Sequence, residues 1–399
     1  MTDLETPVAP ARPGPWPRRV APALLGYAAV RALGLVALAL WSAARDKSPH
    51  QLLTARWDSL WYTRVAELGY GYEVRLPNGD VHSNLAFFPL LPWLERAVSA
   101  VTPLSYADAG LLLSTSASLA AAWGIFAVAD HVYGRRAGIC AVLLWAVLPI
   151  GIVQSMAYSE SLFTALAAWS LYAVLTGRWL TAGLLASLAG LTRPVGAAVV
   201  AAVWVAAVAS FVRDSSARDS SVRERSVAAP DGAPVWRRAL GMLLAPLGAA
   251  GYVLWVGHRT GKGPLGYLDV QAGWGNGFDG GYAFARFVAD KFTSFPSALA
   301  GLGLIVGVAL VIWLYVICVR QGQPLPLLVY AGIVTALALC ASSYFGSKPR
   351  LLLPAFPLLL PLALALARLR TPRSAGVLGG VAVASAVYGA FWLNGSGPP

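Results

Sequence analysis

Charge is the scarcest property of this 399-residue chain, since 12% of its residues are charged while 57% are hydrophobic. A soluble globular domain carries about twice that charged fraction, so the composition argues against a soluble fold. Apolar runs of 17 to 22 residues recur along the chain, and this length crosses a hydrocarbon core of roughly 30 Å. Because helices satisfy their own backbone hydrogen bonds in lipid, we predict an all-α multi-pass membrane protein.

Cysteine is also scarce, and Cys140, Cys318 and Cys340 all fall in apolar segments. Without CxxC spacing or a His/Asp cluster, they indicate small buried hydrophobic side chains rather than a disulfide or a metal site. The chain also lacks GxxxxGK[ST], HExxH and DxD motifs, and its glycines do not fit a strand–GxGxxG–helix unit. We therefore predict no cofactor, and the absence of these motifs does not exclude a divalent metal.

Lysine supplies only four of the thirty basic residues. This arginine bias, together with abundant Ala, Leu, Val and Gly, indicates a GC-rich bacterial genome and hence a bacterial plasma membrane. The net charge of +12 does not require a nucleic-acid partner. The basic residues lie at the ends of apolar segments and in loops, where anionic lipid headgroups account for many of them.

Eleven apolar segments are predicted to span the membrane: 21–43, 107–129, 137–153, 160–176, 179–192, 194–212, 238–257, 297–319, 325–343, 351–367 and 374–394. The fifth is short enough to be re-entrant or broken, which leaves a range of ten to twelve spans. With the N-terminus inside, sixteen basic residues fall in inner segments and thirteen in outer ones, most of the latter in two long loops. Because long loops carry little topological signal, we predict a cytoplasmic N-terminus.

The polar pattern divides the chain into a disordered cytoplasmic tail (residues 1–20) and one membrane domain (21–399). Within that domain we predict an outer loop at 44–106, a flexible cytoplasmic linker at 213–236 and a second outer loop at 258–296. The first loop is expected to hold an interfacial helix at 56–68 and a turn at Pro77-Asn78-Gly79-Asp80. The second is expected to be an irregular ordered loop or a mobile lid.

Asp58 is the first candidate for catalysis, because it lies in the first outer loop between Arg56 and a cluster of aromatic residues. In this partly desolvated setting with Arg56, Trp57 and Trp61, the pKa of a carboxylate can be tuned, and it can accept a proton from an attacking sugar hydroxyl. The alternative is a solvated carboxylate or one that caps a helix.

Glu160 is the second candidate, at the outer start of a predicted span in Ala157-Tyr158-Ser159-Glu160. An acid in the first turn of a helix is favourable on its own, so capping is the competing interpretation. If it faces a cleft, Glu160 would assist Asp58 in catalysis or bind sugar hydroxyls, with Tyr158 as a neighbouring substrate contact.

Three basic residues are candidates for binding a lipid phosphate, because they lie in short outer turns: Arg193, Lys348 and Arg350. Arginine donates paired hydrogen bonds to phosphate, whereas the competing interpretation is snorkelling to headgroups. His82 in the first outer loop is a further candidate substrate contact, against the commoner case of a solvated histidine. Arg31, near the middle of the first span, marks either an inner cavity or a shifted span boundary.

Taken together, the blocks of this sequence resemble the PIG-V-like family (GPI mannosyltransferase 2) of GT-C glycosyltransferases. The resemblance rests on five blocks in order: Arg56-Trp57-Asp58-Ser59 with Glu67-Leu68-Gly69-Tyr70; Ala86-Phe87-Phe88-Pro89-Leu90-Leu91-Pro92; Ala157-Tyr158-Ser159-Glu160-Ser161-Leu162-Phe163; Leu191-Thr192-Arg193-Pro194-Val195-Gly196; and Lys348-Pro349-Arg350-Leu351-Leu352-Leu353-Pro354-Ala355-Phe356-Pro357.

The resemblance implies a GT-C-like helical bundle that moves a mannosyl residue from a polyprenyl-phosphate donor to an acceptor outside the cytoplasm. The acceptor would be a glycolipid, a glycan or a protein, and Asp58 falls where such enzymes carry their catalytic acid. The resemblance leaves three alternatives: a transporter or flippase of a lipid-linked sugar, an enzyme of the same scaffold that uses another sugar, and a non-catalytic scaffold.

Overall fold

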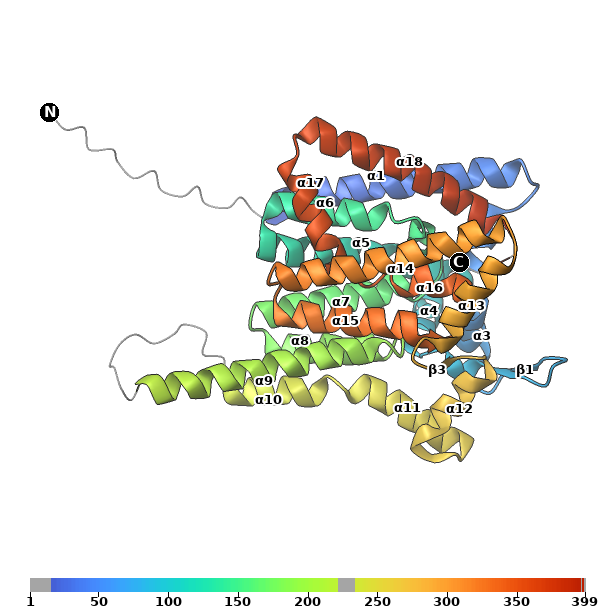
Figure 1. The fold of residues 1–399 in the computed structure, drawn as a ribbon. Coiled ribbons are helices and arrows are strands. Elements are labelled where there is room, and N and C mark those ends of the chain that lie inside the picture. Colours follow the sequence, from blue (N-terminus) through green and yellow to red (C-terminus); the bar gives the residue numbers. More distant parts are fainter. Residues whose placement is uncertain (1–15, 222–233, 396, 398–399) are drawn as a thin grey trace.

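The computed structural model describes residues 16–221, 234–395 and 397 as a bundle of helices with a small cap of loops at one end (Figure 1). The bundle helices are α1 (Trp16–Ala43), α5 (Tyr106–Tyr133), α6 (Arg135–Ala146), α7 (Glu160–Leu175), α8 (Trp179–Gly190), α9 (Gly196–Ser221), α10 (Val235–Leu244), α11 (Leu247–Thr260), α14 (Ser297–Arg320), α15 (Leu325–Cys340), α17 (Leu360–Arg368) and α18 (Thr371–Leu393). In the packing order, α5 lies against α6 and α7, α1 against α18, and α7 against α8.

The cap consists of short elements from the two predicted outer loops and from the turn after α15. They are α2 (Pro49–Thr54), α3 (Asp58–Leu68), β1 (Glu73–Arg75), β2 (Val81–Ser83), α4 (Leu90–Val101), α12 (Gly266–Gly273), β3 (Gly277–Phe278), α13 (Tyr282–Asp290), β4 (Ala341–Ser342) and α16 (Lys348–Leu351). Six 3-10 turns lie in the connections between elements: η1 (Asn84–Ala86), η2 (Gly151–Ser155), η3 (Gly263–Leu265), η4 (Lys291–Thr293), η5 (Phe345–Ser347) and η6 (Phe356–Leu359).

Six described helical stretches are long and apolar enough to cross a membrane, or seven if the bent pair at 345–368 is one span. Three more apolar helices, α7, α8 and α15, have only 12 to 16 residues. At 1.5 Å per residue they are shorter than a hydrocarbon core. The predicted multi-pass helical class is therefore confirmed, but the count of eleven spans is not. Apolar composition extends through the breaks between helices, so it does not reveal where a helix ends.

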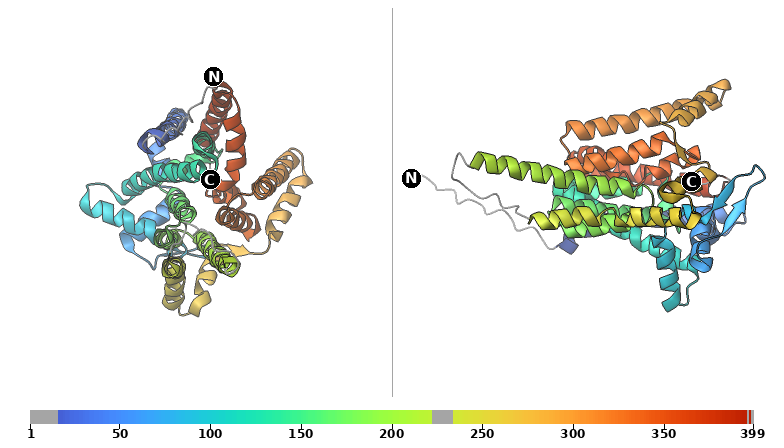
Figure 2. Two further views of the ribbon diagram at one scale, coloured as in Figure 1. Left: turned by 90° about the vertical axis from the view of Figure 1, so that its left-hand side faces the viewer. Right: turned by 90° about the horizontal axis from the view of Figure 1, so that it is seen from below.

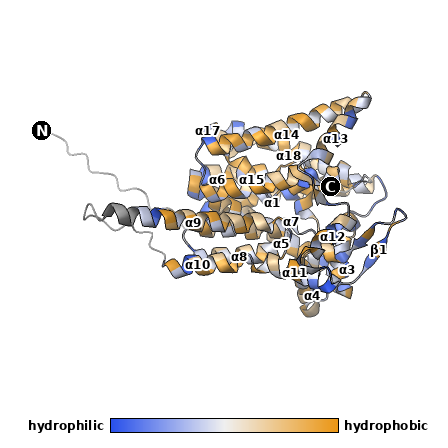
Figure 3. Cartoon of the chain, turned by 60° about the horizontal axis from the view of Figure 1, so that its bottom comes forward, coloured by the Kyte–Doolittle hydropathy of each residue, from blue (hydrophilic) through white to orange (hydrophobic). Residues whose placement is uncertain are grey.

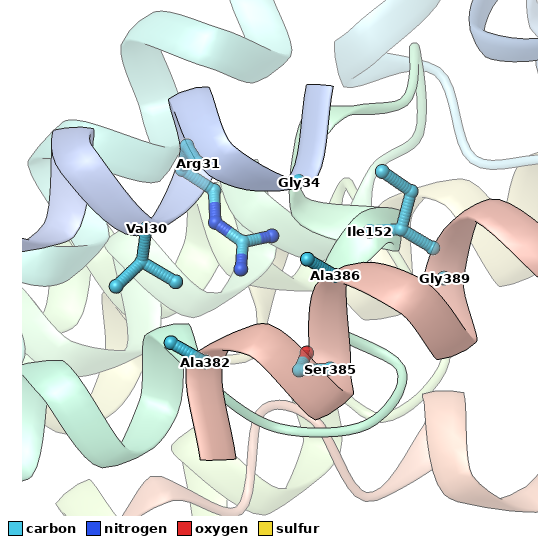
Figure 4. Close-up of a pocket in the computed structure, with 8 residues that line it drawn as sticks. All are labelled: Val30, Arg31, Gly34, Ile152, Ala382, Ser385, Ala386 and Gly389. Carbon is cyan, nitrogen blue, oxygen red and sulfur yellow. The ribbon is translucent and has the colours of Figure 1, made fainter. Parts of the chain in front are cut away.

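The predicted span 137–153 is one such case, because α6 ends at Ala146 and the 3-10 turn η2 follows. Pro149, three residues after the end of α6, cannot continue the helix. The guanidinium of Arg31 on α1 donates hydrogen bonds to the carbonyl oxygen of Ala146 at the helix end and to that of Gly151 in η2. Arg31 also borders a cavity of about 10 Å³ between α1 and α18, close to Ser385 (Figure 4). Arg31 thus binds backbone carbonyls at a break between helices, beside a very small cavity.

Both cap loops gather at one end of the bundle, with the far ends of α9 and α10 at the opposite end (Figures 1 and 2). Hydrophobic residues dominate the bundle helices, whereas polar residues concentrate around α3, α4 and the β1 hairpin (Figure 3). The predicted turn at 77–80 is present, since β1 and β2 pair antiparallel with Val74 opposite His82. The two loops therefore build one polar surface on an apolar bundle.

Three details differ from the predictions. The first nine residues of the predicted linker 213–236 belong to helix α9, which continues to Ser221, whereas the predicted tail and the rest of the linker lie largely outside the described residues. Helix α3 begins at Asp58 rather than at residue 56, and it buries Ser59, Tyr62, Val65 and Ala66 while Leu68 is exposed. The second cap loop is not irregular but contains α12, β3 and α13.

Candidate functional site

Asp58 begins helix α3 at the cap end of the bundle. The preceding residue, Trp57, has φ 51° and ψ −122°, a backbone conformation that costs a non-glycine residue free energy. The hydroxyl of buried Ser59 stabilises the turn, because it accepts from the Arg56 amide at 3.1 Å and donates to the Arg56 carbonyl at 2.6 Å. The strained turn thus places the Asp58 carboxylate in the first turn of helix α3, where the helix dipole favours a negative charge.

Arg350 joins the two candidate acids. Its Nη1 lies 2.7 Å from Asp58 Oδ2 and its Nε lies 3.4 Å from Glu160 Oε1. Glu160 also pairs with Arg193, whose Nη1 lies 2.6 Å from the same oxygen. Four candidate residues from α3, α7, α16 and the turn after α8 therefore meet in one network of two acids and two arginines.

The members of this network differ in exposure. The Asp58 side chain is 24% exposed, whereas that of Glu160 is 1% exposed and that of Arg350 is 9% exposed. Burial lowers the pKa of Arg350, but the attraction of Asp58 and Glu160 outweighs it and raises the pKa above its ordinary value. The pKa of Arg193 is raised for the same reason, with burial opposed chiefly by Glu160. Both arginines remain cations in this setting.

Two tyrosines and a serine complete the wall of the site. The guanidinium carbon of Arg350 lies 5.1 Å from the ring centre of Tyr158, within cation–π range. The Tyr62 hydroxyl lies 2.7 Å from Ser159 Oγ, which also accepts from Arg193 at 3.1 Å. Burial raises the pKa of Tyr62, so this phenol stays protonated. Tyr62 and Ser159 were not among the predicted residues, because neither type is distinctive in sequence.

An aromatic cluster lies beside the network and is formed by Trp61, Tyr72, His82, Phe87 and Trp274. Trp61 stacks on Phe87 with ring centres 5.6 Å apart and meets Trp274 edge-on at 4.9 Å. His82 stacks on Trp274 at 4.1 Å. The structure thus brings the predicted Trp61 and His82 together through Trp274 from the second loop, a residue that sequence spacing could not assign to the site.

Arg56 and Trp57 lie beside the network but are engaged elsewhere. Arg56 Nη1 donates to the carbonyl of Leu393 at 2.9 Å, and its guanidinium reaches Gly395 at 3.2 Å. The guanidinium also lies 4.0 Å from the ring centre of Trp57. Arg56 therefore caps the C-terminal end of α18, and substrate binding by Arg56 and Trp57 remains a prediction.

Lys348, although two residues from Arg350, faces another way. Its ammonium donates to the carbonyls of Ala338 and Ala341, each at 2.8 Å, at the end of α15. It also lies 4.7 Å from the ring centre of Phe284 in the second cap loop. Within the described residues Lys348 makes no ion pair with either acid. Lys348 thus links α15 to the second loop, and its predicted contact with phosphate stays a prediction.

No group of three or more His, Cys, Asp and Glu side chains that could hold a metal occurs in the part of the chain that the structure describes. The acids of the site instead pair with arginines, whose fixed forks match carboxylate and phosphate oxygens. Chemically, the arrangement offers one reachable carboxylate backed by two permanent cations.

Comparison with known protein families finds no match, and neither does comparison with curated proteins. Among solved structures, the chain resembles ArnT from Cupriavidus metallidurans bound to undecaprenyl phosphate, with a TM-score of 0.51 and 17% identity. The match covers 90% of this chain and 62% of ArnT. The apo form of ArnT matches with a TM-score of 0.49 and 16% identity, and the match covers 90% of this chain and 61% of ArnT.

Archaeal AglB from Archaeoglobus fulgidus, in complex with an inhibitory peptide and a dolichol-phosphate, gives a TM-score of 0.45 and 12% identity, covering 94% of this chain and 56% of that one. At such identities the likeness to ArnT shows the fold. The chain is thus a multi-pass membrane protein with a GT-C-like fold that spans about 62% of the length of ArnT. The narrower PIG-V-like resemblance stays a prediction.

Proposed function

We propose that this chain is a membrane glycosyltransferase that moves a sugar from a polyprenyl-phosphate donor to the hydroxyl of an acceptor. One observation carries the proposal: Arg350 bridges the reachable Asp58 and the buried Glu160, so a general base and a phosphate-binding cation share one site. The likeness of fold to ArnT, whose structure holds undecaprenyl phosphate, supports a donor on a polyprenyl-phosphate carrier. Mannose is the sugar that the sequence resemblance favours.

In the proposed reaction, the acceptor oxygen attacks the anomeric carbon of the sugar from the face opposite the phosphate. The bond between that carbon and the phosphate oxygen breaks, the anomeric configuration inverts, and the acceptor proton passes to Asp58. Polyprenyl phosphate leaves with an additional negative charge, which Arg350 and Arg193 stabilise in a poorly hydrated setting. The proton and the new negative charge are thus both taken up by side chains of this chain, and the phosphate remains bonded to its polyprenyl carrier.

Arg350 also links donor binding to the proposed base. In the free site its cation pairs with Asp58 at 2.7 Å. A donor phosphate competes for the same guanidinium, so its arrival releases the Asp58 carboxylate to meet the acceptor hydroxyl. Glu160, 1% exposed behind the arginines, serves in this proposal as a positioning residue that holds Arg193 and Arg350 in place.

We infer that the cap end faces outward and the N-terminus lies in the cytoplasm. The short loops at the opposite end are uniformly basic, the distribution typical of cytoplasmic loops. The acceptor is then an extracytoplasmic glycolipid, glycan or protein.

The test is a reconstituted reaction in lipid nanodiscs with polyprenyl-phosphate mannose, glucose or arabinose, each radiolabelled in the sugar, and crude envelope lipids as acceptors. A transferase releases free polyprenyl phosphate and labels a new product. A flippase in sealed vesicles moves the intact donor across the bilayer and forms neither. If no donor is consumed in nanodiscs while transbilayer movement occurs in vesicles, the transferase is refuted.

A further inference from the structure

A second cavity lies beside the Asp58 turn, outside the network of acids and arginines. It has a volume of about 270 Å³, enough for one sugar ring. Its lining consists of Asp46, Lys47, Ser48, Gln51, Leu52, Ala55 and Arg56. Every lining residue comes from the connection between α1 and α3, so the cavity belongs to the first cap loop.

The cavity is close to the proposed base. Arg56, at its rim, is two residues before Asp58, and consecutive Cα atoms are 3.8 Å apart, so the two Cα atoms are within about 7.6 Å. The hydrogen bonds of Ser59 to the Arg56 amide and carbonyl close this turn tightly. The cavity therefore adjoins the turn that carries Asp58, whose side chain is 24% exposed.

The two cations of the lining are already occupied. Lys47 Nζ donates to the Asn394 carbonyl at 2.6 Å, and Arg56 donates to the carbonyls of Leu393 and Gly395. Both therefore serve to hold the end of α18 against the first cap loop. Asp46 offsets one of the two positive charges, and the N–H groups that Lys47 and Arg56 donate to these carbonyls are not available to an anion such as a second phosphate.

Exposed polar groups remain to bind a ligand. Asp46 offers a carboxylate and has φ 52°, a backbone conformation that is rare for a residue other than glycine. Gln51 offers both an amide donor and an amide acceptor from its exposed side chain. A carboxylate and an amide beside an apolar floor at Leu52 suit a neutral ligand rich in hydroxyl groups.

We propose that this cavity binds the terminal sugar ring of the acceptor, a neutral polyhydroxylated group whose attacking hydroxyl is directed toward Asp58. This inference rests on the proposed transfer reaction, and it divides the site into two parts. The donor phosphate binds at Arg350 and Arg193, while the acceptor sugar binds between α1 and α3 on the other side of the Asp58 turn.

The experiment measures binding of free methyl glycosides (mannoside, glucoside, galactoside and arabinoside) to the full chain in nanodiscs by saturation-transfer NMR. The variants are Gln51→Leu and Asp46→Asn, which alter exposed side chains and leave the backbone hydrogen bonds of α2 intact. Gln321→Leu, exposed in the turn after α14 at the far end of the bundle, is the matched control. Glycerol 3-phosphate serves as the competing anion.

We expect at least one glycoside to bind the wild-type chain, with affinity reduced about three- to tenfold by each cavity variant. Gln51→Leu removes the amide donor and acceptor, and Asp46→Asn replaces a charged acceptor with a weaker neutral one. Gln321→Leu should bind as the wild type does, and glycerol 3-phosphate should not displace the glycoside. Absence of glycoside binding, equal binding by the cavity variants, or displacement by glycerol 3-phosphate would each overturn the proposal.

The same samples separate this proposal from the transfer reaction. If the wild-type chain transfers sugar but the cavity variants bind glycosides normally, the acceptor cavity is wrong and the transferase stands. If the cavity variants lose glycoside binding but the wild-type chain transfers nothing from any donor, the reaction is wrong and the cavity is a sugar site of another purpose.

Discussion

At the scale of single residues, the site depends on one acid that is almost fully buried. Glu160 is 1% exposed and holds Arg193 at 2.6 Å and Arg350 at 3.4 Å. Removing one partner of a buried ion pair leaves the others uncompensated, at a cost of about 3–5 kcal/mol. The geometry of both arginines therefore depends on this carboxylate.

Glu160→Gln is expected to lower the unfolding temperature in detergent and to raise the KM for donor, because two buried cations lose their counter-charge. The lowered stability is measured by thermal unfolding, with Glu67→Gln on the exposed face of α3 as the control. An unfolding temperature equal to that of the wild type would show that Glu160 does not hold the arginines.

Glu95 is a second buried acid, and it lies outside the site on helix α4. It has no exposed surface, and neither carboxylate oxygen has a hydrogen-bond partner among the described residues. Glycine at position 110 makes room for it, because a methyl group there would lie 2.5 Å from Glu95 Oε1. Burial raises the pKa of Glu95 well above its ordinary value of 4.5, so the folded chain keeps this acid protonated.

The pH dependence of stability follows from that shift. Above pH 4.5 the unfolded chain loses the Glu95 proton while the folded chain retains it, so stability falls as pH rises until the raised pKa is reached. Glu95→Gln should remove this contribution and flatten the decline in unfolding temperature between pH 5 and 8. If the variant and the wild type decline with the same slope, Glu95 is not buried as a neutral acid.

The sequence predicted the acids, the arginines and their common face, but not which of them pair. Asp58 and Arg350 are 292 residues apart, and their 2.7 Å contact depends on how α16 packs beside α3. Arg56 and Lys348 were predicted to bind substrate from their residue type and their positions in outer loops. In the structure both donate to backbone carbonyls at helix ends, a role that charge and spacing do not distinguish from phosphate binding.

At the scale of helices, close contact between α8 and α11 requires glycine. A Cβ atom at position 248 would overlap the carbonyl oxygen of Ser187, whereas one at position 251, on the same helix, would meet nothing within 4 Å. Small residues allow such close backbone approach between membrane helices. The pair offers a matched test of packing.

Gly248→Ala is expected to force α8 and α11 apart and to destabilise the protein by about 1–3 kcal/mol, the usual cost of overpacking. Gly251→Ala should be neutral or should stabilise α11 by up to about 1 kcal/mol, because alanine favours a helix. Unfolding temperatures in one detergent compare the two variants. Equal temperatures would contradict the close contact.

Helical class and loop positions could be predicted because long apolar runs and turn residues are local signals. The β1–β2 hairpin around Asn78 and Gly79 is an example. The end of α6 has a local signal in Pro149, but the apolar residues around it continue through the break and hide it in hydropathy. The contact between the Ala146 carbonyl and Arg31, 115 residues earlier in the chain, has no such local signal.

At the scale of the whole molecule, the account requires the cap to face outward. Single cysteines at Asn78, in the hairpin turn, and at Gln321, at the opposite end, report the two sides. In intact cells, Asn78→Cys should react with a membrane-impermeant maleimide, and Gln321→Cys should react only after permeabilisation. The wild-type chain corrects for its own three cysteines. The reverse pattern would put the site in the cytoplasm.

The central claim is that Asp58 removes a proton from the acceptor, and the turnover rate of Asp58→Asn tests it most directly. The amide keeps the shape of the side chain but cannot act as the base. The reconstituted reaction with saturating donor should therefore slow by about 10²–10⁴-fold. Asp269→Asn, which changes an exposed acid of the second cap loop, should retain the wild-type rate. A rate for Asp58→Asn within twofold of the wild type would contradict the mechanism.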